Sequence, residues 1–387
     1  MPEASPEQTV QSTTPVPFRA RLVYTATLLV PALLASLFLR VTVSDRVVPL
    51  NWNLYPPLLG MALLGAACLL LSSYRRCLKG VLAVPMLVLL TWALHREQPL
   101  LLRGVPAPSA PLAGATPIHL MTWNVFIFTW GTAGIEETIR AQKPDVLAIV
   151  EGTTDEPVAR AAFEAALPGY HYAASPRNQL YVLSRYPISD TWENADESNA
   201  RLFRVRLDTP DGPVHLLTLH LRGPWQRNES AAFAELRAAM DAVEGPLIVT
   251  GDFNTPRGSA RLAAVSQGFD DAYLTASRSR YLATWPSIPA PLWQIDHTFT
   301  RGVQLLDATR LPTGESDHEA QLLTLERSDR RAPSRHLGIK LYRPPPAIHR
   351  SPPPHPLTGS SHPATFFAQR HPTGRPTNHT LDRKTSL

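Results

Sequence analysis

Uninterrupted apolar runs dominate the N-terminal part of the chain. Val23–Leu39 and Leu54–Ser73 contain no charged residue, and each approaches the ~20 residues that a helix needs to cross a bilayer. A third run, Gly80–Leu94, is shorter, but Trp92 and the flanking basic residues are typical of interfacial anchors. The pattern predicts two membrane-spanning helices and favours a third, for which the alternative is a short buried or interfacial helix.

The basic residues beside these runs set the expected orientation. With three spans, Lys and Arg are slightly more numerous on the N-terminal side of the membrane, which is the side that the positive-inside rule places in the cytoplasm. We therefore expect a cytoplasmic segment over 1–22, a membrane region over 23–104 and a catalytic domain outside the cytoplasm. With two spans the orientation would be reversed.

The remainder of the chain divides by composition. Residues 105–115 are rich in Pro and Ala and predict a linker, since such residues make a poor core. Residues 116–327 alternate apolar and polar stretches and predict a folded domain. Residues 328–387 are rich in Pro, His and Arg with few apolar residues, so we expect a disordered basic tail that touches anionic lipid.

Within 116–327, runs with strand-like and helix-like periodicity follow one another. The predicted helices are Ala133–Gln142, Pro157–Leu167 and one from an N-cap at Asn228 to Val243; the predicted strands are Ile118–Val125, Val146–Val150, Leu180–Leu183, Leu202–Leu207, Val214–Leu219, Leu247–Thr250 and Glu319–Leu325. Several adjacent strands have no helix between them, so a purely parallel doubly wound sheet is excluded. The pattern predicts mixed sheets packed together with helices outside.

The charge changes how this domain is interpreted. The whole chain has a net charge of +5, but residues 116–327 hold 18 Lys or Arg against 26 Asp or Glu, a net −8. A duplex nuclease gains most of its affinity from Lys and Arg that neutralise phosphates. Because the domain is acidic, we rank nucleic acid as a substrate no higher than another phosphate ester.

Polar side chains stand at the ends of the predicted strands. Asp252 and Asn254 leave the buried strand Leu247–Thr250 two residues apart, where a stiff strand can hold them in fixed directions. Further polar residues in similar places are Asn124, Glu151, His220, Asp296, Asp317 and His318. Each alone is as readily a turn or cap residue, but together they indicate a site for hydrolysis at phosphorus.

Three motifs in this order carry a family resemblance. Gly251-Asp252-Phe253-Asn254, then Ile295-Asp296-His297, then Ser316-Asp317-His318 resemble the endonuclease/exonuclease/phosphatase superfamily of DNase I-like hydrolases, especially its membrane-tethered members from bacterial cell membranes. The resemblance covers about residues 117–326. It implies an α/β four-layer sandwich, with two mixed β-sheets face to face and helices outside. It also implies a divalent cation, Mg²⁺ with Mn²⁺ as the alternative, since Mg²⁺ prefers carboxylate oxygen.

The resemblance further implies a role for each matching residue. It makes Glu151 the principal metal ligand, with Asp317 and Asn124 nearby. Asp252 would orient or deprotonate the attacking water, and Asn254 would fix that water and a phosphate oxygen. His318, held by Asp296, would donate to the phosphoryl oxygens, and His220 would bind phosphate or assist the leaving group.

Some positions depart from the family pattern. Val150 stands where family members often have Gln, so a hydrogen bond to the metal-binding Glu151 is missing. Asn178 and Arg185 match a substrate-contacting segment only in part and are kept as substrate-binding candidates. If Asp296 and His297 both lie on a strand, His297 faces away from Asp296, so it is left out of the site.

The sequence therefore predicts a membrane-anchored, metal-dependent hydrolase of phosphate esters, a phosphodiesterase or a phosphatase. Its partners would be a phosphate-ester substrate and membrane lipid; no protein partner is indicated. One alternative is a nuclease on nucleic acid, for which Arg177, Arg185, Arg222, Arg227 and Arg257 would supply a local basic rim. A second alternative is a non-catalytic membrane scaffold that retains the fold.

Overall fold

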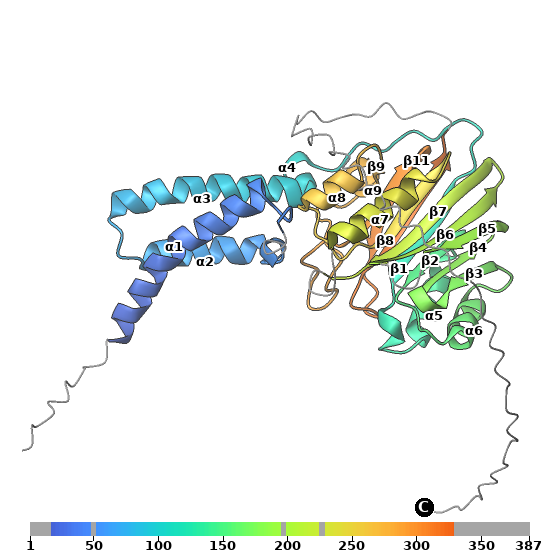
Figure 1. Cartoon of the computed structure of the whole chain (residues 1–387), viewed down its shortest axis with the longest axis horizontal. Helices are drawn as coiled ribbons and strands as arrows, with labels where there is room; N and C mark the ends of the chain where they lie inside the picture. The colour runs from blue at the N-terminus through green and yellow to red at the C-terminus, as the bar shows by residue number, and fades with distance from the viewer. Residues whose placement is uncertain (1–16, 48–51, 195–198, 224–228, 329–387) are drawn as a thin grey trace, which may run out of the picture. The chain divides into compact units, whose positions relative to one another are not determined.

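The computed structural model describes residues 17–47, 52–194, 199–223 and 229–328 (Figure 1). It begins with the apolar helices α1 (Phe18–Thr42), α2 (Leu58–Leu71) and α3 (Arg76–Glu97), followed by the short α4 (Pro99–Arg103). By length and composition alone, α1 and α3 could each cross a membrane. The predicted N-cap Asn228 and nearly all of the predicted tail lie outside the described residues.

The second and third apolar runs differ from their predicted lengths. Residues Leu54–Ser73 do not form one long helix, because α2 begins only at Leu58 and has 14 residues. Two prolines, Pro56 and Pro57, precede it, and Pro57 is the N-cap residue of α2, a position where the missing N–H of proline costs no helical hydrogen bond. The third run, predicted as the weaker span, is instead the 22-residue α3.

Two six-stranded sheets form the rest of the described structure. In order across the first sheet, the strands are β11 (Val303–Leu311), β12 (Ala320–Arg327), β1 (Ile118–Asn124), β2 (Val146–Val150), β4 (Leu180–Ser184) and β3 (His171–Ser175). Across the second they are β5 (Ile188–Glu193), β6 (Ala200–Thr209), β7 (Gly212–Leu221), β8 (Leu247–Asp252), β10 (Asp296–Arg301) and β9 (Asp270–Asp271). Pairs β1–β2 and β7–β8 are parallel and the others antiparallel, so both sheets are mixed, as the sequence predicts.

Side chains that alternate along the central strands build three apolar layers. Ile248 of β8 joins the core between the sheets, whereas Leu247 and Val249 face α7 (Glu229–Asp241) and α8 (Ala260–Val265) on the other side. Strand β2 alternates in the same way, with Leu147 and Ile149 packed towards α5 (Ala133–Gln142) and α6 (Glu156–Ala166). Strands covered on both faces are apolar throughout, and this produces the four-layer sandwich of Figure 1.

The segment predicted as a linker, 105–115, is held on the sandwich. The backbone N–H of Leu112 donates to Glu326 of β12, and Gln304 of β11 donates to the carbonyl of Ala110. These bonds tie the segment to the edge of the first sheet, so it is not a free tether in this structure.

Candidate active site

Strand register brings the predicted residues of the second sheet side by side. His220 pairs with Asp252 across the parallel strands β7 and β8, and Asp296 pairs with Asp252 across the antiparallel strands β8 and β10. In the first sheet, Asn124 pairs with Val150, the residue before Glu151. The same ends of the two sheets meet here, because Asn124 Nδ2 donates to Asp252 Oδ2 at 3.1 Å.

The Asp252 turn is fixed by its neighbours in Gly-Asp-Phe-Asn. A Cβ on Gly251 (φ +138°) would lie 2.1 Å from the carbonyl oxygen of Leu219, so only glycine fits beside β7. Phe253 is fully buried and meets His297 and Phe299 edge to face. Asn254 has a left-handed φ of 47°, and its backbone N–H donates to Asp252 Oδ1 at 2.7 Å. The motif therefore holds a buried carboxylate in one direction.

His318 lies between two carboxylates. Its Nδ1 donates to Asp296 Oδ2 at 2.8 Å, and its Nε2 lies 3.7 Å from Asp252 Oδ2. Thr284 Oγ1 also donates to Asp296 Oδ2, at 2.6 Å. Burial acts to lower the pKa of His318, but the charges of Asp296, Asp252 and Asp317 outweigh it and raise that pKa to about 10. His318 is therefore an imidazolium at neutral pH.

The Ser-Asp-His loop is tied to β1. Ser316 Oγ donates to the carbonyl of Asn124 at 2.7 Å, and Trp123 Nε1 donates to the carbonyl of His318 at 3.0 Å. Asp317 is partly exposed, accepts a hydrogen bond from Trp285 Nε1 at 2.9 Å and places Oδ1 4.0 Å from His318 Nε2. The loop thus presents one carboxylate to solvent beside the buried imidazolium.

Glu151 and His220 form the other half of the cluster. Glu151 has a left-handed φ of 50° directly after β2, a backbone conformation that is uncommon outside glycine and marks constrained sites. Its Oε1 lies 3.2 Å from His220 Nε2. Burial lowers the pKa of His220 to about 3, helped by the nearby charge of Arg201, so His220 is neutral. A neutral ring with Nε2–H donates to Glu151 and leaves Nδ1 to accept from Arg201, 3.4 Å away.

The donor set of the cluster suits a divalent cation. Ligand-type atoms within 4.8 Å of one another fall into two groups among the described residues, Glu151 with His220 and Asp252, and Asp252 with Asp296 and His318. Burial and the charge of Asp296 raise the pKa of Asp252 well above its ordinary value, and burial raises that of Glu151. Four carboxylates, those of Glu151, Asp252, Asp296 and Asp317, outnumber the cationic side chains beside them, which are His318, Arg201 and Arg222. A hard cation would offset the remaining negative charge with its preferred oxygen ligands.

The remaining predicted residues are placed differently. Asn178 is buried, ends the short 3₁₀ segment Pro176–Asn178 and has no hydrogen-bond partner for Nδ2. It precedes Gln179, whose carbonyl accepts from Gly152 beside Glu151. Arg185 instead donates to Asp145 at 3.0 Å, before the start of β2 and thus at the opposite end of that strand from Glu151. The structure therefore does not bring Arg185 to the cluster.

His297 faces away from the cluster, as predicted for the residue after Asp296 on a strand. It is fully buried and its Nε2 contacts the carbonyl of Thr255. Burial lowers its pKa to about 4, so it is neutral in the core.

Most of the proposed basic rim is paired with carboxylates. Arg177 pairs with Glu193, Arg185 with Asp145 and Arg257 with Asp271, and Arg227 lies outside the described residues. Arg222, whose charge also acts on His220, remains beside the site together with Arg201. Four residues near the site were not predicted from the sequence: Arg201, Thr284, Trp285 and Tyr55. The hydroxyl of Tyr55 donates to the carbonyl of Asn254 at 2.8 Å. None of these belongs to a motif.

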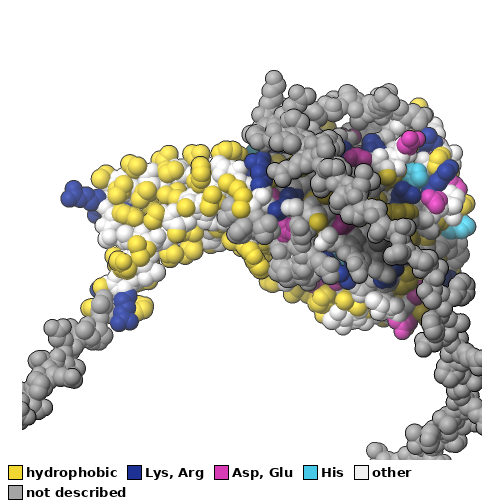
Figure 2. All heavy atoms as spheres, viewed as in Figure 1, with side chains coloured by type: hydrophobic (Ala, Val, Ile, Leu, Met, Phe, Trp, Pro, Cys, Tyr) yellow, Lys and Arg dark blue, Asp and Glu magenta, His cyan; other side chains and the backbone are white. Residues whose placement is uncertain are grey.

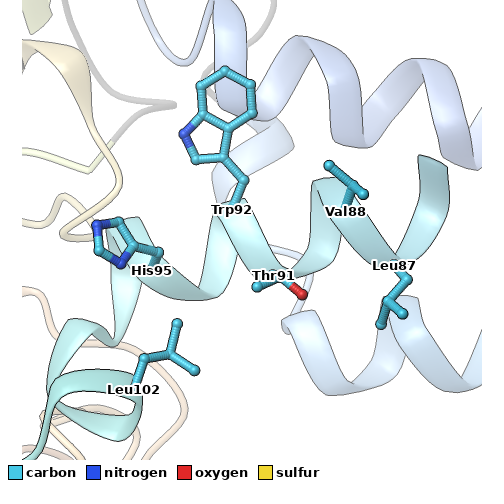
Figure 3. Close-up of a pocket in the computed structure, with 6 residues that line it drawn as sticks. All are labelled: Leu87, Val88, Thr91, Trp92, His95 and Leu102. Atoms are coloured by element: carbon cyan, nitrogen blue, oxygen red, sulfur yellow. The ribbon is translucent and has the colours of Figure 1, made fainter. Parts of the chain in front are cut away.

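An apolar pocket lies away from this chemistry. It is formed by Leu87, Val88, Thr91, Trp92 and His95 of α3 with Leu102 of α4 (Figure 3). His95 is its only titratable lining residue, so this pocket has no acid–base pair with which to act on a phosphate ester.

Several solved structures are similar to part of this chain. Among solved structures, the chain is similar to an endonuclease/exonuclease/phosphatase family protein from Bacteroides thetaiotaomicron (14% identity, TM-score 0.46, covering 55% of this chain and 96% of that one). It is also similar to D. rerio TDP2 complexed with a single-strand DNA product (16%, TM-score 0.45, 54% and 99%) and to sphingomyelinase C from Streptomyces griseocarneus (17%, TM-score 0.43, 54% and 99%). No curated protein matches the sequence.

The family profile decides the classification. The profile of the Endonuclease/Exonuclease/phosphatase family matches residues 121–318, which run from β1 to the Ser-Asp-His loop and make up just over half of the chain. The chain belongs to the endonuclease/exonuclease/phosphatase family, whose members hydrolyse phosphoester bonds.

Proposed function

We propose that this protein is a membrane-anchored hydrolase of phosphate esters that depends on a divalent cation, Mg²⁺ or alternatively Mn²⁺. The observation that carries the proposal is the contact set of Asp252, which lies in register between His220 and Asp296 and within reach of His318 and Asn124. In this chemistry the water oxygen bonds to phosphorus, the bond to the leaving oxygen breaks, and a proton reaches that oxygen.

Asp252 is the proposed base. Its carboxylate is buried and its pKa is raised by burial and by Asp296, which makes it a better proton acceptor than an ordinary Asp. Asn254 Nδ2 donates to the carbonyl of Leu221 at 2.8 Å and to Asp252 Oδ2 at 3.3 Å, so its Oδ1 would accept a hydrogen bond from the attacking water beside that carboxylate. In this role Asp252 would remove the proton from the water that attacks phosphorus.

His318 is the proposed donor to the phosphoryl oxygens. As an imidazolium it offers Nε2–H to the negative charge that develops in the transition state, while Asp296 holds Nδ1. Neutral His220 would donate to a phosphate oxygen or to the leaving group once it turns from Glu151, with Arg201 beside it. Asn178 Nδ2, a buried donor without a partner, would bind a substrate oxygen.

Glu151, Asp317 and Asn124 are the proposed ligands of the cation. When bound, the cation would polarise the phosphoryl group and lower the pKa of a coordinated water. Asn124 Oδ1 already accepts from the N–H of Phe126 at 3.0 Å, and an amide oxygen can accept there and also contact a metal.

The helices support the membrane anchoring. Hydrophobic side chains cover the visible surface of the helical part, with basic side chains at its far end (Figure 2). Arg40 near the end of α1 pairs with Glu97 at the end of α3, so these two ends lie together. Ser73, after α2, donates to Thr27 of α1, so α2 runs back along α1. Three passes would put the catalytic domain on the face opposite the N-terminus, outside a bacterial cytoplasm.

The test is turnover by the full chain in detergent micelles. We expect release of nitrophenolate from bis-para-nitrophenyl phosphate or para-nitrophenyl phosphate with Mg²⁺, and loss of that release with a chelator. Hydrolysis of oligonucleotides alone, for which Arg201 and Arg222 would supply phosphate contacts, would favour the nuclease. No turnover on esters, lipids and oligonucleotides would favour the non-catalytic scaffold.

A further inference from the structure

Exposed apolar side chains gather on the loops that bound the candidate site. We call Trp52, Ile127, Trp130, Ile288 and Leu292 the apolar rim; each is between 43% and 60% exposed. Elsewhere in the described part of residues 116–328, the exposed large apolar side chains are Val158 and Trp192. The apolar exposure of the catalytic domain is thus concentrated where the site opens.

Each loop of the rim is bonded to a site residue. Phe126 N–H donates to Asn124 Oδ1, and Ile127 N–H donates to the carbonyl of Glu151 at 2.8 Å. In the loop 285–293, Trp285 donates to Asp317. In the loop before α2, Tyr55 donates to Asn254. Each loop that carries rim residues is therefore attached directly to a residue of the candidate site.

The backbone of one loop is strained to present these side chains. Phe126, Ile127 and Phe128 have left-handed φ values of 49°, 53° and 55°. This conformation is a genuine outlier for a β-branched residue such as Ile, and it strains the backbone. This strained backbone leaves the side chain of Ile127 half exposed, although burying that side chain would stabilise the fold. We take this as an indication that a partner covers Ile127.

The chemistry of the rim distinguishes possible partners. Segments 52–57, 125–131 and 285–293 contain no charged residue, but they contain Trp, Phe, Ile, Leu and Pro. A nucleic acid strand requires Lys or Arg against its phosphates. Uncharged aromatic and aliphatic loops suit the boundary between headgroups and acyl chains, where Trp is enriched.

The apolar helices are clamped to the same region. Asp45, just after α1, accepts hydrogen bonds from Ser259 and from the N–H of Ala260, and Arg96 of α3 donates to the carbonyl of Gly258 at 2.7 Å. Segment 258–260 follows the Asn254 turn in sequence, and Tyr55 holds that turn itself. The C-terminal ends of α1 and α3 therefore contact a segment that lies only four to six residues after Asn254 in the sequence.

We infer that the mouth of the site contacts the bilayer surface through the apolar rim, and that the substrate is a phosphoester in the headgroup of a membrane lipid. This inference rests on the proposed function. The reaction remains hydrolysis, in which water supplies HO to phosphorus and H to the departing oxygen, so no further reactant is needed.

The experiment uses the full chain reconstituted in vesicles of phosphatidylcholine and phosphatidylglycerol with Mg²⁺. Release of lipid phosphate or headgroup is compared with hydrolysis of soluble bis-para-nitrophenyl phosphate by the same sample. Trp130→Ser and Ile288→Ser should lower the ratio of lipid rate to soluble rate about tenfold each, equivalent to about 1.4 kcal/mol. The matched controls Trp192→Ser and Val158→Ser should leave the ratio at the parent value.

A second measurement is independent of turnover. Lipids with brominated acyl chains should quench the fluorescence of the parent protein, and Trp130→Phe should remove part of that quenching whereas Trp192→Phe should not. Equal quenching in both variants, or a rim substitution that instead dissociates a dimer, would overturn the membrane contact.

The outcomes separate the two proposals. Hydrolysis of the soluble ester without hydrolysis of lipid, or faster hydrolysis of an oligonucleotide, would overturn the lipid substrate and leave the proposed function in place. No hydrolysis of any ester would overturn the proposed function, and the quenching result would still decide whether the rim meets the bilayer.

Discussion

The Asp296–His318 pair offers the sharpest prediction, because a nearly isosteric change removes one charge. Asp296 contacts His318 Nδ1 at 2.8 Å, and both side chains are less than 10% exposed. A His318 pKa of about 10, against an ordinary value of 6.5, corresponds to about 5 kcal/mol in favour of the imidazolium. Asp296 is the largest contributor that raises this pKa, so Asp296→Asn should lower it strongly.

The expected loss of rate follows from the role proposed for His318. Losing one donor to a developing oxyanion costs about a hundredfold to a thousandfold in kcat, and we expect Asp296→Asn to approach that loss at neutral pH. The rate of the parent protein should persist until the imidazolium loses its proton near pH 10. In the variant this alkaline limb should move towards neutral pH, because the largest charge that opposes the effect of burial on the pKa of His318 is then gone.

The contribution of His318 to the free energy of unfolding should also fall as the pH rises. The folded pKa of His318 is raised above its unfolded value, so its contribution is fully present below about pH 6.5 and is lost as pH rises through about 10. The difference in unfolding free energy between the parent and Asp296→Asn should therefore shrink towards alkaline pH. The assay is a pH profile of kcat/KM on the soluble diester, with Asp190→Asn, an exposed carboxylate paired with Arg204, as control. An unchanged alkaline limb with a rate within about twofold of the parent would refute the assignment.

Three further predictions concern the helical part. Arg40→Met leaves the partly buried carboxylate of Glu97 without its bidentate partner and should lower the free energy of unfolding by about 3–5 kcal/mol. Adding Glu97→Met should restore only part of this loss, because the carbonyls of Asn53, Leu54 and Pro56 still lack the hydrogen bonds of Arg40; thermal unfolding in detergent measures both. Tyr55→Phe removes a neutral hydrogen bond to Asn254 and should lower kcat about threefold to tenfold with KM retained; equal rates would show that Tyr55 does not position that turn. Exposed Cys77 at the start of α3 should resist a membrane-impermeant maleimide in intact cells while Glu164→Cys reacts, and the opposite labelling would reverse the proposed topology.

Sequence patterns predicted most of the central strands and the helices against them, but not β10 (Asp296–Arg301). Residues Val146–Val150 and Ala133–Gln142 form the predicted strand and helix with the predicted bounds. Edge elements were missed, because β3 (His171–Ser175) and β5 (Ile188–Glu193) have largely exposed or half-exposed side chains and no apolar alternation. An edge strand is defined by the pairing of its backbone, and that leaves little trace in composition.

The motif residues at strand ends could be found from the sequence, but their supporting contacts could not. Strand ends carry a recognisable change from apolar to polar positions, as at Asp252. Tyr55 stood inside a run interpreted as a span, and only the late start of α2 after Pro57 frees it to reach Asn254. Arg185 directly follows β4, but the sequence does not show that β4 pairs antiparallel with β2, which places Arg185 beside the start of β2 and not beside Glu151 at its end.

The most direct test of the account is turnover of a soluble phosphodiester in heavy-oxygen water by the full chain with Mg²⁺, beside Asp252→Asn with the same melting temperature. Attack of water at phosphorus with Asp252 as the base predicts one heavy oxygen in each phosphate product of the parent. It also predicts a rate in the variant that is lower by at least about a thousandfold. Full turnover by Asp252→Asn, or heavy oxygen found only in the alcohol product, would contradict attack of water at phosphorus beside Asp252.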